Sequence, residues 1–322
     1  MIMTKVTIVG AGNVGASAAL RVADLQKDCE IVMIDIAGDF AKGKALDMSA
    51  ALSLTDFSGS VVGGDDYSLS SKSDVVVITA GIARKVGMSR EDLLAINAKI
   101  VGSVVSEVVK ESSECIIIVV TNPLDIMTRL AYEKSGFDSS CVIGMAGVLD
   151  TARFQFEVAN ALRLKGFSVS GGDVKAVVLG GHGDLMLPVV SSSTVLVEGM
   201  EKKLEDLFDS SEIEDIVSLV KHGGARVVSL LKTGSAYVAP GYSIAKMVNC
   251  ILTGKEEVMP CSVMLKGEYG LNDVFIGCLA KLGKKGVLEI VEMPLSESEK
   301  SGLLSSAEKI NNVLFENKKL FN

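Results

Sequence analysis

The chain has 322 residues, of which 48% are hydrophobic and 22% are charged. This composition supports a buried core and excludes a disordered chain. The net charge of -8 argues against nucleic acid or an anionic membrane as a partner, because both select for a basic face. An acidic protein that handles an anionic substrate must therefore gather a few cationic groups locally.

The amino-terminal residues MIMTKVTIVG lead directly into an apolar strand, without the basic region, apolar core and cleavage site of a secretory signal. The most hydrophobic stretches, such as 115–120, are interrupted well before the roughly 20 residues that span a bilayer. The six cysteines lie far apart, with no C-x-x-C pair and no histidine cluster nearby. We therefore expect a cytoplasmic protein with reduced, buried thiols and no metal site.

Short apolar runs alternate with longer helical stretches through the first 145 residues. The runs predict six strands, at 5–9, 30–34, 61–63, 74–79, 115–120 and 141–144. Strands that are separated by helices form a parallel, doubly wound sheet. Because crossover connections are right-handed, helices should cover both faces of this sheet.

A glycine-rich turn, GAGNVG, follows the first predicted strand and opens a helix over 14–25. Gly10 permits a tight turn, Gly12 lets a pyrophosphate approach the backbone, and Gly15 allows close helix packing. The helix amino terminus offers N–H groups and a positive dipole end to phosphates. The turn is the predicted pyrophosphate site of a Rossmann fold, and it also contains Ala11, Asn13 and Val14.

An acidic residue, Asp35, ends the second predicted strand, 20 residues after Gly15. Its carboxylate can accept a hydrogen bond from a ribose 2′-hydroxyl and would repel a 2′-phosphate. Ile36 and Ala37 supply no compensating arginine, so the sequence predicts NAD rather than NADP. The alternative is a glycine turn in an unrelated α/β protein, with an acidic residue at this place by chance.

A loop at 80–93 follows the fourth predicted strand and lies at the carboxyl edge of the sheet, where ligands bind. It carries Arg84, Lys85 and Arg90 among glycines. Such a loop can close over a substrate, exclude water and bring a guanidinium to a carbonyl oxygen where negative charge develops. A solvated basic loop is the alternative interpretation.

The pattern changes after residue 145 to that of a mixed domain. We expect a long helix, strands at 174–179 and 191–197, helices across 211–231 and 242–252, a hairpin of 257–266 and 273–279, and a final helix at 296–317. No Pro-rich or Ser-rich linker separates the halves. We expect two domains that share an interface, a doubly wound parallel α/β domain at 1–145 and an α+β substrate domain at 146–322.

The chain contains two histidines, His182 and His222. His182 lies in the glycine-rich loop GGHGD, whereas His222 lies in a helical stretch that indicates a surface or packing role. Hydride transfer from a hydroxyl carbon needs a base during oxidation and an acid during reduction, and an imidazole does both at neutral pH. The candidate carboxylate that would fix its tautomer is Asp150, and its rival Asp184 is expected to hold the loop.

Over essentially its whole length the chain resembles the lactate/malate dehydrogenases, and within them the lactate-dehydrogenase-like malate dehydrogenases. The segments that carry the resemblance are, in chain order, GAGNVG, MIDI, ITAGIARKVGMSREDLL, VTNPLD, GVLDTARF, GGHGDLMLP, KTGSAYVAP and YGLND. The resemblance implies reversible hydride transfer between malate and oxaloacetate with NAD. It also implies a homo-tetramer, with a dimer as the alternative.

The resemblance implies a role for each matching site residue. His182 would accept and donate the proton with Asp150 as its partner, and Arg153 would clamp the carboxylate next to the reacting carbon. Arg90 would polarise the carbonyl from the closing loop. The other implied contacts are Asn122 with substrate and the nicotinamide end, Val120, Thr121 and Asn97 with the cofactor, and Ser235 with the pocket floor.

Arg84 occupies the position that discriminates substrates in the family, where lactate enzymes usually carry glutamine and malate enzymes arginine. A second guanidinium demands a second carboxylate, because an unpaired cation closed over a methyl group would cost several kcal/mol. Three residues depart from the pattern. Val86 replaces a proline, and Gly241 and Tyr242 replace small residues, so that Tyr242 alters either the pocket floor or a subunit contact.

Two other functions remain open at this point. One is a dehydrogenase of lactate or another 2-hydroxy acid, against which Arg84 argues. The other is a non-catalytic NAD-binding protein, against which the presence of His182, Asp150, Arg90 and Arg153 together argues.

Overall fold

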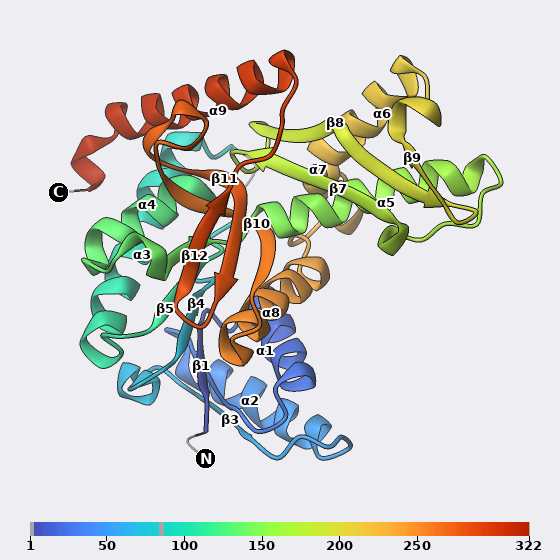
Figure 1. Ribbon diagram of the computed structural model, residues 1–322. Coiled ribbons are helices and arrows are strands. Elements are labelled where there is room, and N and C mark those ends of the chain that lie inside the picture. The colour runs from blue at the N-terminus through green and yellow to red at the C-terminus, as the bar shows by residue number, and fades with distance from the viewer. Residues whose placement is uncertain (1–2, 84–86, 322) are drawn as a thin grey trace.

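The computed structural model describes residues 3–83 and 87–321 (Figure 1). The first half of the chain forms the predicted parallel sheet, and each strand begins and ends within one residue of its predicted bounds. Its strands are β1 (Lys5–Val9), β2 (Glu30–Ile34), β3 (Ser60–Gly64), β4 (Val75–Ile78), β5 (Ile116–Val119) and β6 (Val142–Gly144). They lie in the order β3-β2-β1-β4-β5-β6, which confirms the doubly wound fold.

Helices cover both faces of this sheet (Figure 1). They are α1 (Asn13–Leu25), α2 (Gly38–Leu52), α3 (Arg90–Glu111) and α4 (Leu124–Ser135). Every residue of β4 and β5 is buried, as expected of Val- and Ile-rich strands covered from both sides. The carboxyl ends of the central strands are thus left as the accessible edge of the sheet.

The second half begins with α5 (Gly147–Leu164) and contains an antiparallel region. Its remaining elements are β7 (Val174–Gly180), β8 (Met186–Val197), β9 (Met200–Lys203), α6 (Ser210–Lys221), α7 (Gly223–Leu231), α8 (Val238–Thr253), β10 (Glu257–Lys266), β11 (Asn272–Gly283), β12 (Gly286–Val291) and α9 (Glu297–Glu316). None of the helices in the described ranges is long and apolar enough to cross a membrane.

Three features of this half differ from the sequence prediction. The single helix expected across 211–231 is broken into α6 and α7 at His222, where two glycines, which are poor helix formers, follow. Strands β9 and β12 were not expected. Most of their residues are at least partly exposed, so neither strand shows a clear alternation of apolar and polar positions.

The two halves are joined by the sheet itself. Gly144 of β6 pairs with Ser262 of β10, and the sheet continues from β10 through β11, β7 and β8 to β9. A Cβ on Gly144 would lie 2.7 Å from the Cβ of Ser262, so a glycine is needed at this crossing. The pairing places the start of α5 and the turn between β7 and β8 beside the carboxyl edge of the parallel strands.

Candidate active site

The glycine-rich turn has the geometry of a phosphate-binding turn. Gly10 has a φ of +109°, which favours glycine. A Cβ on Gly15 would lie 1.9 Å from the carbonyl oxygen of Gly10, so only glycine lets α1 start this close to β1. Nothing lies within 4 Å of the Cβ position at Gly12, and the first turn of α1 holds no acidic residue. An anion can therefore approach this helix amino terminus.

Asp35 follows β2 and lies beside this turn. Its Oδ2 accepts a hydrogen bond from the backbone N–H of Ala11 at 2.9 Å, and its Oδ1 accepts one from Ala37 at 3.0 Å. Each oxygen of an ionised carboxylate has a second lone pair. The carboxylate is held in place and can still accept a hydrogen bond from a ribose hydroxyl, which fits NAD.

Asn97 of α3 is fully buried and ties together the loops that follow β4 and β5. Its Oδ1 accepts from the Ile82 N–H at 2.9 Å, and its Nδ2 donates to the Asn122 carbonyl at 2.6 Å. Thr121 donates from Oγ1 to the Ala80 carbonyl at 2.7 Å and links the same two loops. These polar groups therefore shape the edge where a cofactor would lie, next to the half-buried Val120 and the exposed Asn122.

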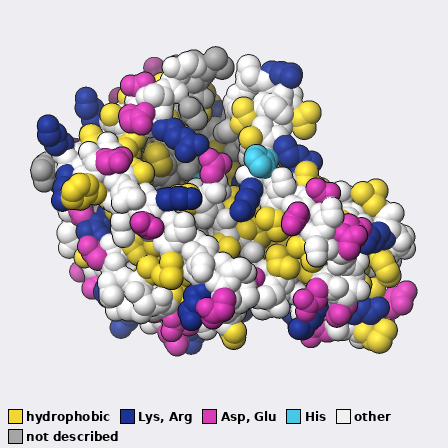
Figure 2. Space-filling model, turned by 90° about the horizontal axis from the view of Figure 1, so that it is seen from above, with side chains coloured by type: hydrophobic (Ala, Val, Ile, Leu, Met, Phe, Trp, Pro, Cys, Tyr) yellow, Lys and Arg dark blue, Asp and Glu magenta, His cyan; other side chains and the backbone are white. Residues whose placement is uncertain are grey.

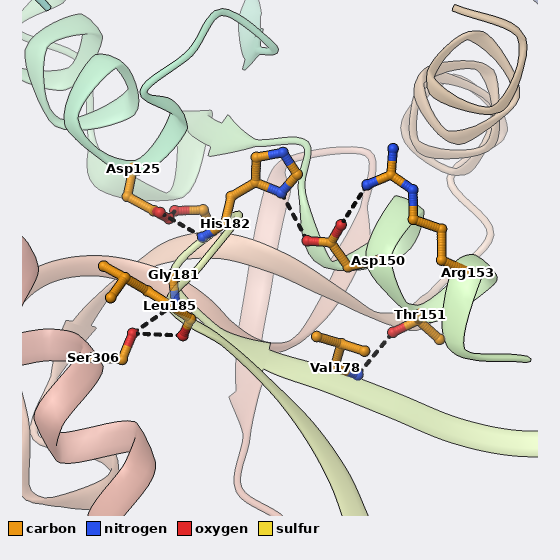
Figure 3. Close-up of polar contacts among 10 residues, drawn as sticks. Asp125, Asp150, Thr151, Arg153, Val178, Gly181, His182, Leu185 and Ser306 are labelled. Atoms are coloured by element: carbon orange, nitrogen blue, oxygen red, sulfur yellow. Dashed lines mark hydrogen bonds and ion pairs between the residues drawn. The ribbon is translucent and has the colours of Figure 1, made fainter. Parts of the chain in front are cut away.

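His182 lies in the tight turn between β7 and β8, and Figure 3 shows its ring directed toward Asp150. Gly183 follows it with a φ of +85°, which explains the glycine there. His182 Nδ1 is 2.7 Å from Asp150 Oδ2. Because an ionised carboxylate only accepts hydrogen bonds, Nδ1 carries the proton, and the Nε2 lone pair of the neutral imidazole is left available.

Asp150 and Arg153 lie three residues apart on one face of α5, as the spacing predicts. Arg153 Nη1 donates to Asp150 Oδ1 at 3.1 Å, so His182, Asp150 and Arg153 form a connected chain (Figure 3). The Asp150 side chain is 2% exposed. It lies in the first turn of α5, where the helix dipole stabilises a negative charge.

The electrostatic surroundings of His182 favour its protonated form. Burial lowers its pKa, but the charge and hydrogen bond of Asp150, together with the charge of Asp125, outweigh burial, and the pKa is raised above 6.5. The positive charge of Arg153 opposes this effect in part.

Asp125 was not identified as a site residue from the sequence. It lies in the first turn of α4, and its Oδ2 accepts the backbone N–H of His182 at 2.9 Å. The only sequence signal was an acidic residue two positions after the proline in VTNPLD, between two predicted strands, which ordinarily indicates the start of a helix alone. Gly181 is held by a second unpredicted residue, Ser306 of α9, whose Oγ accepts the Gly181 N–H at 2.9 Å.

Arg90 is the first residue of α3 and reaches across to the histidine turn. Its Nη2 is 2.7 Å from Asp184 Oδ2, and both side chains are largely exposed. The predicted loop at 80–93 therefore extends too far, because α3 already begins at Arg90 with Ser89 as its cap. Asp184, expected to hold its own loop, contacts the first residue of that helix. Ser235 lies exposed between α7 and α8. Arg84, Lys85 and Val86 lie outside the described residues.

The amino terminus of α7 packs against Arg153. A Cβ on Gly223 would lie 3.2 Å from Arg153 Cδ, and one on Gly224 would lie 3.7 Å from Nη2. Arg226, one turn later, forms an ion pair at 2.6 Å with the buried Glu157 of α5. The glycines leave space for the Arg153 guanidinium, a function that the sequence did not indicate for them.

In the view of Figure 2, basic side chains gather around the hollow between the larger and smaller lobes of the molecule. Acidic side chains are interspersed elsewhere over this face, as expected for an acidic protein whose cations are concentrated locally. In the described ranges, no group of three or more His, Cys, Asp or Glu side chains is arranged to hold a metal ion.

Comparison with known families accounts for almost the entire chain. Residues 4–144 match the lactate/malate dehydrogenase NAD binding domain, and residues 147–320 match the lactate/malate dehydrogenase alpha/beta C-terminal domain. The chain belongs to the lactate/malate dehydrogenase family.

Individual family members are similar over nearly their full length. A malate dehydrogenase of Pelodictyon phaeoclathratiforme is 48% identical over 94% of this chain and 95% of its own length. The malate dehydrogenase structure from Salinibacter ruber is 44% identical, covers 98% of both chains and has a TM-score of 0.91. A lactate dehydrogenase from Cryptosporidium parvum, complexed with lactic acid and nicotinamide adenine dinucleotide, is 34% identical, covers 100% of this chain and 99% of its own, and also has a TM-score of 0.91.

Two departures of this chain from the family pattern lie at the contact between α1 and α8. A Cβ on Gly241 would lie 2.3 Å from Ser17 Oγ and 2.9 Å from the Ser17 carbonyl carbon, so glycine allows the two helices to approach closely. Tyr242 is 51% exposed, and the Arg21 guanidinium stacks on its ring at 3.9 Å.

Proposed function

We propose that this chain is an NAD-dependent malate dehydrogenase that interconverts malate and oxaloacetate. The observation that carries the proposal is the hydrogen-bonded series His182–Asp150–Arg153. It lies beside the carboxyl edge of the parallel sheet, where the glycine-rich turn follows β1. It combines a proton carrier with a cation that can hold a carboxylate. The malate dehydrogenases at 45–48% identity support the choice of substrate.

In the oxidation direction, His182 Nε2 takes the proton of the substrate hydroxyl, while Nδ1 keeps its hydrogen bond to Asp150. The buried Asp150 then stabilises the imidazolium, and in the reverse direction the imidazolium returns the proton to the carbonyl oxygen. When bound, NAD accepts the hydride that leaves the hydroxyl-bearing carbon. Arg153 holds the adjacent carboxylate. Arg90 leaves its ion pair with Asp184 when substrate binds and then polarises the substrate carbonyl.

The residues that would hold NAD lie along the carboxyl edge of the parallel strands. Gly10, Gly12 and Gly15, with Ala11, Asn13 and Val14, would surround the pyrophosphate, and Asp35 would bind the adenosine ribose. Val120, Thr121, Asn97 and Asn122 would line the nicotinamide end, and Ser235 the floor of the substrate pocket. These assignments follow the family pattern.

A lactate dehydrogenase is the second candidate, because the Cryptosporidium parvum enzyme with lactic acid has the same TM-score as the malate enzyme from Salinibacter ruber. The backbone fold therefore does not discriminate the two substrates. Arg84 does so in our proposal, because its guanidinium would pair with the distal carboxylate of oxaloacetate and would have no partner over the methyl group of pyruvate.

The test is NADH oxidation by the purified protein with oxaloacetate and with pyruvate, for the wild type and two arginine variants. Truncating one partner of a desolvated charge pair costs about 2 to 5 kcal/mol, so Arg84→Gln should lower kcat/KM for oxaloacetate by roughly 30-fold to several thousand-fold. Pyruvate reduction should stay unchanged or improve.

Arg153→Gln is the matched variant, and it should impair both substrates because each presents the carboxylate that Arg153 would hold. A wild type that prefers pyruvate would support the lactate candidate. An equal loss of kcat/KM for both substrates in Arg84→Gln would mean that Arg84 acts on loop closure or folding and does not discriminate between the substrates.

We also infer the organisation and location of the enzyme. The chain divides into a nucleotide-binding unit at 1–145 and a substrate unit at 146–322. Six free thiols, five of them buried, fit a reducing compartment such as the cytoplasm. Large apolar side chains that remain exposed on the helices, including Leu46, Phe156 and Val238, support a homo-oligomer. The preference for a tetramer over a dimer follows from the family resemblance.

A further inference from the structure

His182 lies between two carboxylates, of which only Asp150 was assigned as its partner from the family resemblance. Asp150 contacts the ring from α5, and Asp125 contacts the backbone from α4, on the opposite side (Figure 3). The two acids differ in their partners. Asp150 shares its charge with Arg153 at 3.1 Å, whereas the hydrogen bonds to Asp125 come from neutral groups.

Asp125 is held rigidly in a buried site. The residue is 6% exposed, its Oδ2 accepts the His182 N–H at 2.9 Å, and its Oδ1 accepts the hydroxyl of the fully buried Ser262 at 2.7 Å. Ser262 belongs to β10, at the pairing with Gly144 of β6. The carboxylate therefore connects the histidine turn to α4 and to the strand that joins the two halves of the sheet.

The charge of Asp125 acts through a medium of low polarity. Burial, with a smaller contribution from the charge of Asp150, raises the pKa of Asp125 above its usual range, and the hydrogen bonds from Ser262 and the His182 N–H together with the charge of His182 oppose this effect only in part. The first turn of α4 also favours its ionised form, because the helix dipole is positive there. The other charges that face His182 are Asp150 and Arg153 from α5, and the exposed pair of Asp184, in its own turn, with Arg90 of α3.

We propose that Asp125 is a second carboxylate for His182: it fixes the backbone of the histidine turn through Oδ2, and its negative charge favours the imidazolium. Arg153 partly neutralises the charge of Asp150. The two hydrogen bonds that Asp125 accepts in the described structure come from neutral groups, so its negative charge is not offset in this way. Asp125 is a positioning residue, since it acts on the proton carrier and not on the substrate. This inference rests on the proposed role of His182 as the proton carrier.

The test is a pH titration of the two histidine side chains by NMR, in cofactor-free protein labelled at histidine. With only His182 and His222 in the chain, each spectrum contains two imidazole systems, and His222 serves as the internal reference. Asp125→Asn keeps the size of the side chain and an oxygen that can accept the His182 N–H, but removes the charge. It should lower the titration midpoint of His182 by about 0.5 to 1 pH unit.

Two further variants separate charge from structure. Asp125→Ser is a second neutral variant for the case that Asp125→Asn does not fold, and it should shift the midpoint in the same direction. Ser306→Ala removes another side chain that holds this turn, through Gly181, without changing any charge. It should leave the His182 midpoint in place.

An unchanged His182 midpoint in both neutral variants, or an equal shift in Ser306→Ala, would overturn the proposal and reduce Asp125 to a structural anchor. The titration needs no substrate. A wild type that fails to oxidise malate would therefore count against the proposed function only, whereas an unshifted midpoint in an active enzyme would count against Asp125 only.

Discussion

The two ring nitrogens of His182 have different surroundings. Nδ1 donates to a carboxylate that is itself held by Arg153, and Nε2 is left to exchange a proton. This arrangement selects one tautomer before substrate binds. The charge and hydrogen bond of Asp150 also raise the histidine pKa above its ordinary value, so the imidazolium persists to a higher pH than that of a free histidine.

The pH dependence of activity should follow the charge of His182. Malate oxidation needs the neutral imidazole, so its kcat/KM should rise with pH through the histidine pKa, above 6.5. Oxaloacetate reduction needs the imidazolium and should fall over the same interval. His182→Ala should abolish both transitions and lower turnover by roughly 100-fold or more.

The measurement is the pH profile in both directions, with NADH binding followed by fluorescence as a check on the site. His222→Ala is the control, because His222 lies exposed between α6 and α7 and its Nδ1 bonds the Ser218 carbonyl, away from the site. Equal losses in the two variants would show that His182 is not the proton carrier.

At the scale of the elements, the close packing of α1 against α8 depends on a glycine, Gly241, at the point of contact. α1 presents phosphate-binding N–H groups at one end, and α8 packs along it through Gly241. The spacing of the two helices is thus set by a contact too close for any Cβ. Tyr242, the next residue, belongs to the same contact and stacks on Arg21 of α1.

Gly241→Ala should destabilise the fold, because its Cβ would lie 2.9 Å from the Ser17 carbonyl carbon and the helices would have to separate. We expect a loss of about 1 to 3 kcal/mol, the range for overpacking. Gly102→Ala is the matched control. Gly102 also lies within a helix, α3, but nothing is within 4 Å of its Cβ position, so alanine should stabilise by about 0.4 to 1 kcal/mol.

The comparison is made by denaturant unfolding of both variants and the wild type under one set of conditions. If Gly241→Ala were as stable as Gly102→Ala, the close approach of α1 and α8 would not be a determinant of stability.

On the scale of the whole molecule, a single continuous sheet places the site between the two halves of the chain. The parallel strands supply the turn, the loops and Asp35, and the second half supplies His182, Asp150 and Arg153. Neither half alone contains a complete site. The pairing of Gly144 with Ser262 joins the two halves within this sheet.

The proposed tetramer predicts a solution mass of about four times the 33.8 kDa of one chain, measured by light scattering after gel filtration. The physical reason is the exposed apolar surface on α2, α5 and α8, where Leu46 is 75% exposed and Phe156 54% exposed. A mass of two chains would support the dimer, and a mass of one chain at micromolar concentration would contradict the homo-oligomer.

The sequence by itself determined the parallel sheet, the glycine-rich turn, Asp35 and the pairing of Asp150 with Arg153 on one helix face. Each of these depends on residues close together in the chain, where strand alternation, turn chemistry and helix spacing act locally. The resemblance to a family connected His182 to Asp150, which lie 32 residues apart. The break at His222 and the strands β9 and β12 were missed because the local pattern there is weak.

Only the tertiary structure decided which groups surround His182. Asp125 is 57 residues from the histidine that it holds, Ser262 is 137 residues from Asp125, and Ser306 is 125 residues from Gly181. Side chains at such separations meet because strands and helices pack in a particular order, and no periodicity along the chain encodes their contact. Local patterns therefore predict which elements form, while packing between distant elements determines the charges that face the proton carrier.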